Sequence, residues 1–166
     1  ALLVSGTLGD AALGRRPGAA PALVRRQRRP TPRLALGRAL AMLAHAGLDV
    51  SDGLLQDLGH LCDASRVGAT VLLDALPLSP AYRRAVEAGP DARPFDAALG
   101  GGEDYELLVA VPPGRVGRAR EAARKLDVPL TVVGEATTER GVRVLDADGR
   151  RYTIRAAGHD HLAPTS

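Results

Sequence analysis

The chain has 166 residues, of which 45% are hydrophobic, so it can form one domain with its own core and is not a disordered chain. The formal net charge of +3 is mild and requires no polyanionic partner. The single cysteine, Cys62, excludes an intrachain disulfide and a multi-cysteine metal site. A lone cysteine fits a reducing cytosol, so we expect a cytoplasmic protein, and with no apolar run of membrane length we expect no contact with a membrane.

The first residues predict a strand, a turn and a helix. Ala1–Ser5 is typical of a short buried strand, and the chain opens inside it without a methionine, so we expect a fragment that lacks an N-terminal part. Gly6–Asp10 predicts a turn, and Ala11–Gly14 begins a helix. Such a turn can offer backbone N–H groups to an anion, but it lacks the lysine of a P-loop and the third glycine of a dinucleotide site. We therefore favour a tight connection.

A cluster of arginines surrounds Pro30-Thr31-Pro32 and comprises Arg25, Arg26, Arg28, Arg29 and Arg33. We favour a solvated surface, with the phosphate of a nucleotide or of nucleic acid as the alternative ligand. The cluster contains no aromatic residue, which argues against a platform for stacking single-stranded bases. Pro32 suits the first turn of a helix predicted over residues 33–46.

The next segment combines a strand, an acidic turn and a helix. Ala46–Val50 is an apolar approach that contains Asp49, and Ser51 and Asp52 follow it. A helical apolar stripe comes next, formed by Leu54, Leu55, Leu58, Leu61 and Cys62. Either Ser51 or Asp52 is expected to be the helix N-cap. Two close carboxylates repel each other unless a cation binds, so the turn indicates a site for magnesium and a nucleotide. The alternative is an ordinary cap with a second, solvated aspartate.

A second acidic segment, Gly100–Glu106, precedes an apolar strand at Leu107–Val111. Three glycines permit tight turns and the close approach of a ligand. The acids around Tyr105 suit a cation, either a metal or an organic ring that the tyrosine could cover. The alternative is a polar hairpin loop.

The remaining segments complete an alternation of strands and helices. We expect strands at 69–74 and 128–133, helices at 81–88 and 112–126, and a hairpin over 141–154. The histidines of Gly158-His159-Asp160-His161 have no third metal ligand nearby, so a metal site there is not favoured. The predicted fold is α/β (or α+β), one domain over residues 1–166 with a mixed sheet covered by helices.

Four motifs in this order resemble the thiamine-monophosphate kinase family, in the superfamily of aminoimidazole ribonucleotide synthetase. They are Gly6–Asp10, Asp49–His60, Gly101–Leu108 and Gly158–His161. The second and third motifs are the specific ones. The resemblance covers nearly the whole chain but only the C-terminal part of the enzyme.

The resemblance implies transfer of the γ-phosphoryl group of ATP to thiamine monophosphate, with Mg²⁺, giving thiamine diphosphate. It implies that Asp49 and Asp52 hold magnesium, that Ser51 touches ATP, and that Glu103 contacts the cationic substrate. His159 falls where the family places a substrate-contacting residue that is often larger and aromatic, and its imidazole can still pack on a ring.

The resemblance also implies an absent N-terminal domain that supplies further magnesium-binding aspartates and the interface of a homodimer. We therefore expect the chain alone to be inactive or nearly so. Two alternatives remain, namely another ATP-dependent synthetase of the superfamily and a basic module that binds nucleic acid.

Overall fold

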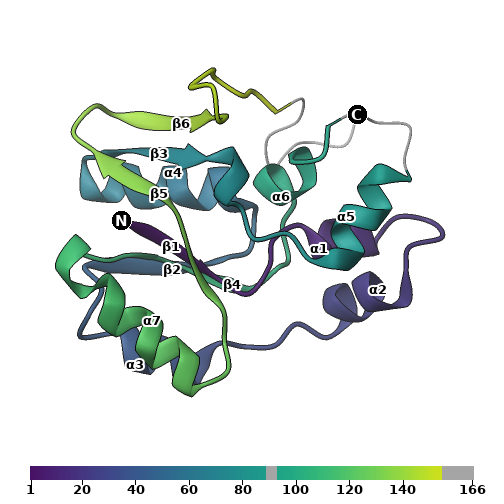
Figure 1. The fold of residues 1–166 in the computed structure, drawn as a ribbon, viewed down its shortest axis with the longest axis horizontal. Coiled ribbons are helices and arrows are strands. Elements are labelled where there is room, and N and C mark those ends of the chain that lie inside the picture. Colours follow the sequence, from purple (N-terminus) through teal and green to yellow (C-terminus); the bar gives the residue numbers. More distant parts are fainter. Residues whose placement is uncertain (89–92, 155–166) are drawn as a thin grey trace.

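The structure is a computed structural model that describes residues 1–88 and 93–154. Its centre is a six-stranded sheet in the order β2-β4-β1-β5-β3-β6 (Figure 1). The strands are β1 (Leu2–Ser5), β2 (Ala46–Val50), β3 (Gly68–Leu72), β4 (Glu106–Ala110), β5 (Leu130–Thr137) and β6 (Gly141–Leu145). Neighbouring strands are antiparallel except for the parallel pair β3 and β6, so the predicted mixed sheet is confirmed.

Helices cover both faces of this sheet (Figure 1). They are α1 (Asp10–Gly14), α2 (Pro21–Arg28), α3 (Leu34–Leu40), α4 (Leu54–Ser65), α5 (Pro80–Glu87), α6 (Asp96–Gly100) and α7 (Val116–Lys125), with short 3₁₀ turns at Leu73–Ala75 and Pro113–Arg115. Among the described residues, no helix has the length and apolarity needed to cross a bilayer.

The strands alternate between two apolar cores, as a period of two requires. In β1, Val4 faces the larger core beneath α1, α4 and α6, whereas Leu3 faces the smaller core beneath α3 and α7. In β4, Leu108 and Val109 divide in the same way. The sheet is therefore buried on both faces, and its functional groups are confined to its ends and edges.

Strand order brings three polar segments to one end of the sheet. β1 and β2 lie on either side of β4 and are both antiparallel to it, so both of them end where β4 begins. Val50 lies opposite Glu106 in this register. We call this the acidic end of the sheet, and it consists of the turns Gly6–Gly9 and Ser51–Gly53 and the segment Gly101–Tyr105.

Several predicted boundaries are wrong. The helix expected over 33–46 stops at Leu40, because β2 already begins at Ala46, and α2 and α6 had not been predicted. The strand expected at 128–133 continues to Thr137 as β5, and Gly134 lies inside it, where a Cβ atom would come 2.0 Å from the Thr70 carbonyl oxygen. A glycine is therefore required there by the closeness of β3 rather than by a turn. Of the hairpin expected over 141–154, the first strand is present as β6, and the second consists of a single antiparallel bridge between Arg151 and Leu145.

Candidate active site at the acidic end of the sheet

The acidic turn is held by a carboxylate from the helix that follows it. Asp57, which is 5% exposed, accepts hydrogen bonds through one oxygen from the backbone N–H groups of Ser51, Asp52 and Gly53 at 2.9, 3.0 and 3.2 Å. Helix α4 begins at Leu54, with Gly53 as its N-cap and no side-chain cap. The expectation that Ser51 or Asp52 is the cap is wrong, because the helix begins only after Gly53, and the backbone N–H groups of Ser51 and Asp52 are bound to Asp57 in the turn before it.

This arrangement leaves the side chains of the turn available. Asp49 is exposed on β2, an edge strand, and Ser51 and Asp52 are half-buried in the turn. Among the described residues, none forms a hydrogen bond or ion pair with the carboxylate of Asp49 or Asp52. Burial raises the pKa of Asp57 above its usual value, although its backbone hydrogen bonds oppose the shift. Asp57 therefore organises the turn, whereas Asp49 and Asp52 have free oxygens for a ligand.

The glycine segment packs backbone to backbone against this turn. Glu103 N–H donates to the Ser51 carbonyl at 2.8 Å, and Tyr105 N–H donates to the Val50 carbonyl at 2.8 Å. A Cβ atom on Gly102 would lie 2.3 Å from the Ser51 oxygen. The structure therefore joins the two acidic motifs of the sequence into one site, and it brings Glu103 beside Ser51.

Gly102→Ala should separate the two segments. A methyl group at this position meets backbone rather than a flexible side chain, so we expect a loss of about 1–3 kcal/mol in the free energy of unfolding. Urea unfolding of the purified protein measures it. Gly117→Ala on α7 is the matched control, because a Cβ atom there meets nothing within 4 Å and alanine favours the helix. Equal stability of both variants would contradict the close contact.

Two residues of the glycine segment have left-handed backbone conformations, Glu103 with φ +71° and Tyr105 with φ +51°. Such conformations cost about 1–3 kcal/mol each for residues other than glycine and are concentrated at functional sites. Tyr105 is 41% exposed, and its ring is available to a ligand. The carboxylate of Glu103 forms an ion pair with Arg15, with 2.8 Å between Oε2 and Nη1. The geometry of this contact is not that of a hydrogen bond, so Oε2 has a compensating charge but no hydrogen-bond donor. Because both side chains are more than a third exposed, this pair contributes little stability.

The middle acid of the segment, Asp104, binds the glycine turn that follows β1. Its carboxylate is 2% exposed and accepts hydrogen bonds from the N–H groups of Gly9 at 2.6 Å and Ala11 at 3.2 Å. Burial raises the pKa of Asp104 to about 7, although these two hydrogen bonds oppose the shift. The expected tight connection at this turn is confirmed, since its N–H groups serve an internal anion.

Asp104 should make stability depend on pH. Its folded-state pKa of about 7 lies above the usual value of 3.8, so between these values the folded state keeps a proton that the unfolded chain has released. Stability therefore falls as pH rises across this window, by about 1.4 kcal/mol for each pH unit, and levels off above it. Urea unfolding from pH 5 to 8 should show this slope in the wild type and not in Asp104→Asn, whereas the exposed Asp63→Asn retains it. A slope that persists in Asp104→Asn would assign the titration to another group.

The last acid of the segment, Glu106, is fully buried and holds two arginines from the predicted basic cluster. Its oxygens accept hydrogen bonds from Arg33 Nε and Nη2 at 2.7 and 2.8 Å, Arg26 Nη2 at 2.6 Å and Ser5 Oγ at 2.6 Å. Burial alone would raise the pKa of Glu106, but the hydrogen bonds and charges of these partners outweigh it and hold the pKa below its usual value. The favoured expectation of a solvated arginine surface is therefore wrong for Arg26 and Arg33, because a buried carboxylate draws them inward.

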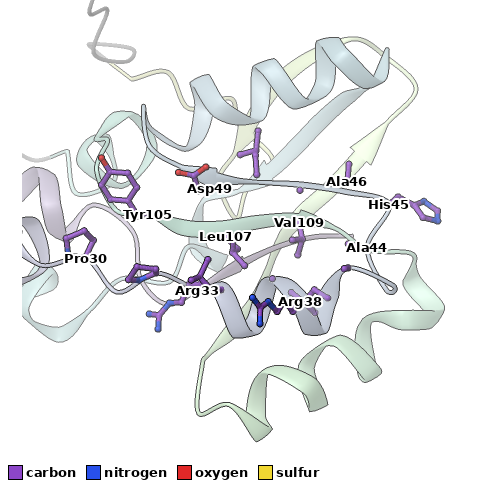
Figure 2. Close-up of a pocket in the computed structure, with 17 residues that line it drawn as sticks. Pro30, Arg33, Arg38, Ala44, His45, Ala46, Asp49, Tyr105, Leu107 and Val109 are labelled. Atoms are coloured by element: carbon purple, nitrogen blue, oxygen red, sulfur yellow. The ribbon is translucent and has the colours of Figure 1, made fainter.

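A cavity of about 790 Å³ opens between α3 and the strands β2 and β4 (Figure 2). Leu107 and Val109 of β4 point into it, while Asp49 and Tyr105 lie at the end opposite His45. Arg33 also lines this cavity. The carboxylate of Asp49, on the strand before the acidic turn, therefore borders a mainly apolar cavity.

The predicted site residues are placed as follows. Ser51, Asp52 and Glu103 belong to the acidic end of the sheet but are not among the described residues that line the cavity with Asp49. His159 lies outside the described residues, as does the rest of its motif.

The donor set fits magnesium bound together with a phosphate. Among the described residues, no cluster of three or more histidine, cysteine or acidic side chains could hold a metal without further ligands. Asp49 and Asp52 supply hard carboxylate oxygens, and Mg²⁺ is commonly bound by one or two carboxylates plus the oxygens of a substrate phosphate.

Two residues that organise the site were missed in the sequence, although each carries a signal. Asp57 is an acid in the first turn of a predicted helix, and the start of a helix has more free backbone N–H groups than one capping side chain can bind. Glu106 alternates with Leu108 on an inward face of β4, and an acid at such a position needs a cationic partner.

Most of the chain's length is similar in sequence and in fold to known proteins. It is 43% identical over 141 residues to the thiamine-monophosphate kinase of Salmonella typhimurium, covering 85% of this chain and 42% of that protein. The structure of the thiamine-monophosphate kinase of Stenotrophomonas maltophilia matches with a TM-score of 0.79 and 41% identity, covering 91% of this chain and 50% of the other. A structure of AaThiL complexed with AMPPCP and TMP matches with a TM-score of 0.76 and 32% identity, covering 95% and 49%.

The chain thus spans about half the length of the curated relatives it matches. The family model for "AIR synthase related protein, C-terminal domain" matches residues 1–147. The first three of the four motifs lie within the matched residues, and the resemblance inferred from the motifs is confirmed at this level. The chain belongs to the AIR synthase related protein family, as its C-terminal domain.

Proposed function

We propose that the chain is the C-terminal part of an enzyme that transfers the γ-phosphoryl group of ATP to thiamine monophosphate and forms thiamine diphosphate. The observation that carries the proposal is the acidic end of the sheet, where the unpaired carboxylates of Asp49 and Asp52 stand on a strand end and on the turn after it, and where the backbone of that turn is hydrogen-bonded to Glu103 at Ser51. Relatives named thiamine-monophosphate kinase support it, as does the similarity to AaThiL complexed with AMPPCP and TMP.

In this proposal each residue has a stated role. Asp49 and Asp52 would hold Mg²⁺, which neutralises phosphate charge so that two anionic reactants can approach. Ser51, whose side chain is free because Asp57 organises the turn, contacts ATP. Glu103 faces the thiazolium cation, which takes the position of the Arg15 guanidinium at that carboxylate.

Further parts of the proposal rest on the resemblance alone. His159 contacts the substrate, the complete enzyme is a homodimer in the cytoplasm, and this chain by itself has little or no activity. The acceptor is already an anionic phosphate, so the transfer needs positioning and charge neutralisation rather than a strong general base.

The test is product formation by the full-length protein. Incubation with ATP, Mg²⁺ and thiamine monophosphate should give thiamine diphosphate and ADP in equal amounts, measured by chromatography. Thiamine in place of thiamine monophosphate is the control and should give no diphosphate. ATP hydrolysis coupled to ring closure of another substrate, without thiamine diphosphate, would favour a synthetase of the same superfamily instead.

A further inference from the structure

A buried ion cluster adjoins the proposed catalytic turn. The side chain of Glu106 is 0% exposed, and those of Arg26 and Arg33 are 23% and 17% exposed. Gly6 has φ +56°, and a Cβ atom there would lie 2.1 Å from a Glu106 oxygen. The backbone after β1 is therefore shaped to admit this carboxylate.

Stability alone is a poor reason for such a cluster. Desolvating charges costs several kcal/mol per ion, and well-packed apolar side chains of similar volume often serve as well. Glu106 faces two guanidinium groups, and Asp104, the further carboxyl that interacts electrostatically with Arg26, is kept partly protonated at neutral pH because burial raises its pKa to about 7, so the cluster keeps an excess of positive charge. An excess of charge of this kind is suited to an anionic ligand.

The arginines also keep unused donors. Glu106 accepts from Nε and Nη2 of Arg33 and from Nη2 of Arg26. No described residue accepts a hydrogen bond from the remaining guanidinium nitrogen of Arg33, or from Nε or Nη1 of Arg26. Guanidinium groups held in this way offer oriented donors that match phosphate oxygens.

The cluster lies where the substrates of the proposed reaction would meet. Glu106 is the first residue of β4 and pairs with Val50, the residue that separates Asp49 from the acidic turn. Arg33 lines the cavity that Asp49 and Tyr105 also border, and Figure 2 shows it on the side of that cavity formed by α3. The positive cluster and the free carboxylates therefore occupy the same end of the sheet.

We propose that Arg33 and Arg26, positioned by Glu106, bind a phosphate group of one of the two substrates. This inference rests on the proposed function for the identity of the substrates. Glu106 is a positioning residue, since it reaches the phosphate only through the arginines. The phosphate belongs either to ATP or to thiamine monophosphate, and the chemistry of recognition is the same.

Binding of matched ligand pairs to the full-length protein tests the proposal. Calorimetry compares thiamine monophosphate with thiamine, and the ATP analogue AMPPCP with adenosine, in the wild type and in Arg33→Gln, Arg26→Gln and Glu106→Gln. Loss of a charged hydrogen bond should weaken the phosphorylated member of one pair about tenfold or more and leave its unphosphorylated partner unchanged. The pair that responds identifies the substrate.

Arg28→Gln, an exposed arginine of α2 that does not line this cavity, is the control and should change neither pair. Arg33→Gln removes two hydrogen bonds to Glu106, whereas Arg26→Gln removes only one. If Arg33→Gln does not fold, Arg26→Gln therefore still provides the test. Equal weakening of both members of a pair, or unchanged binding in folded variants, would overturn the inference. Phosphate-specific binding without thiamine diphosphate formation would support the inference while overturning the proposed function.

Discussion

Glu106→Ala should cause the largest loss of stability of any single substitution at the acidic end of the sheet. It removes the carboxylate that compensates Arg26 and Arg33, and breaking a buried pair in this way typically costs about 3–5 kcal/mol. Urea unfolding at neutral pH measures the loss. Glu121→Ala is the control, because that glutamate pairs with Arg124 on the surface of α7 and should change stability by less than about 1 kcal/mol.

The same carboxylate should make the protein sensitive to acid. The pKa of Glu106 is lower in the folded state than in the unfolded chain, so its contribution is complete above the unfolded value of 4.5 and is lost as pH falls through the folded pKa. Glu106→Ala should therefore lose its disadvantage relative to the wild type in strong acid. A difference between the two proteins that stays constant down to that range would contradict an ionised, arginine-bound Glu106.

Asp49→Asn and Asp52→Asn should each lower the rate of thiamine diphosphate formation by about two orders of magnitude or more. Each change removes one of two carboxylates, and the described residues provide no third histidine, cysteine or acid grouped with them. Mg²⁺ and the triphosphate should therefore bind more weakly. The rate is measured in the full-length protein at saturating substrates over a range of Mg²⁺ concentrations. The loss should be partly offset by high Mg²⁺.

Asp63→Asn is the matched control for these variants, because Asp63 is an exposed acid on α4 beyond the acidic turn. It should leave the rate within about twofold of the wild type, as expected for a surface substitution. Activity of Asp49→Asn or Asp52→Asn close to the Asp63→Asn value would remove that residue from the metal site.

Local patterns were sufficient to predict the elements that meet at the site. The apolar approach to Asp49 and the stripe from Leu54 to Cys62 predict β2 and α4, and both are present. The two acidic motifs were also recognised as candidates for function. What the sequence did not show is that they touch, because the contact between Gly102 and Ser51 depends on the pairing of β2 with β4.

The roles of individual acids were harder to predict, because they depend on which neighbours compete for each backbone or side-chain donor. Ser51 and Asp52 are residue types that often cap helices, but here Gly53 is the N-cap, and Asp57 binds the backbone N–H groups of all three turn residues. Asp104 and Glu106 flank Tyr105 in an acidic run, but both are buried while Tyr105 is exposed. Only the tertiary structure shows that Asp104 binds the turn after β1 and that Glu106 binds arginines.

A crystal structure of the full-length protein with Mg²⁺, AMPPCP and thiamine monophosphate tests directly whether Asp49 and Asp52 hold the metal. Magnesium should lie about 2.0–2.1 Å from carboxylate oxygens of both Asp49 and Asp52, with the remaining ligands from phosphate and water. Magnesium coordinated to the nucleotide without either carboxylate, while the turn held by Asp57 stays intact, would contradict it.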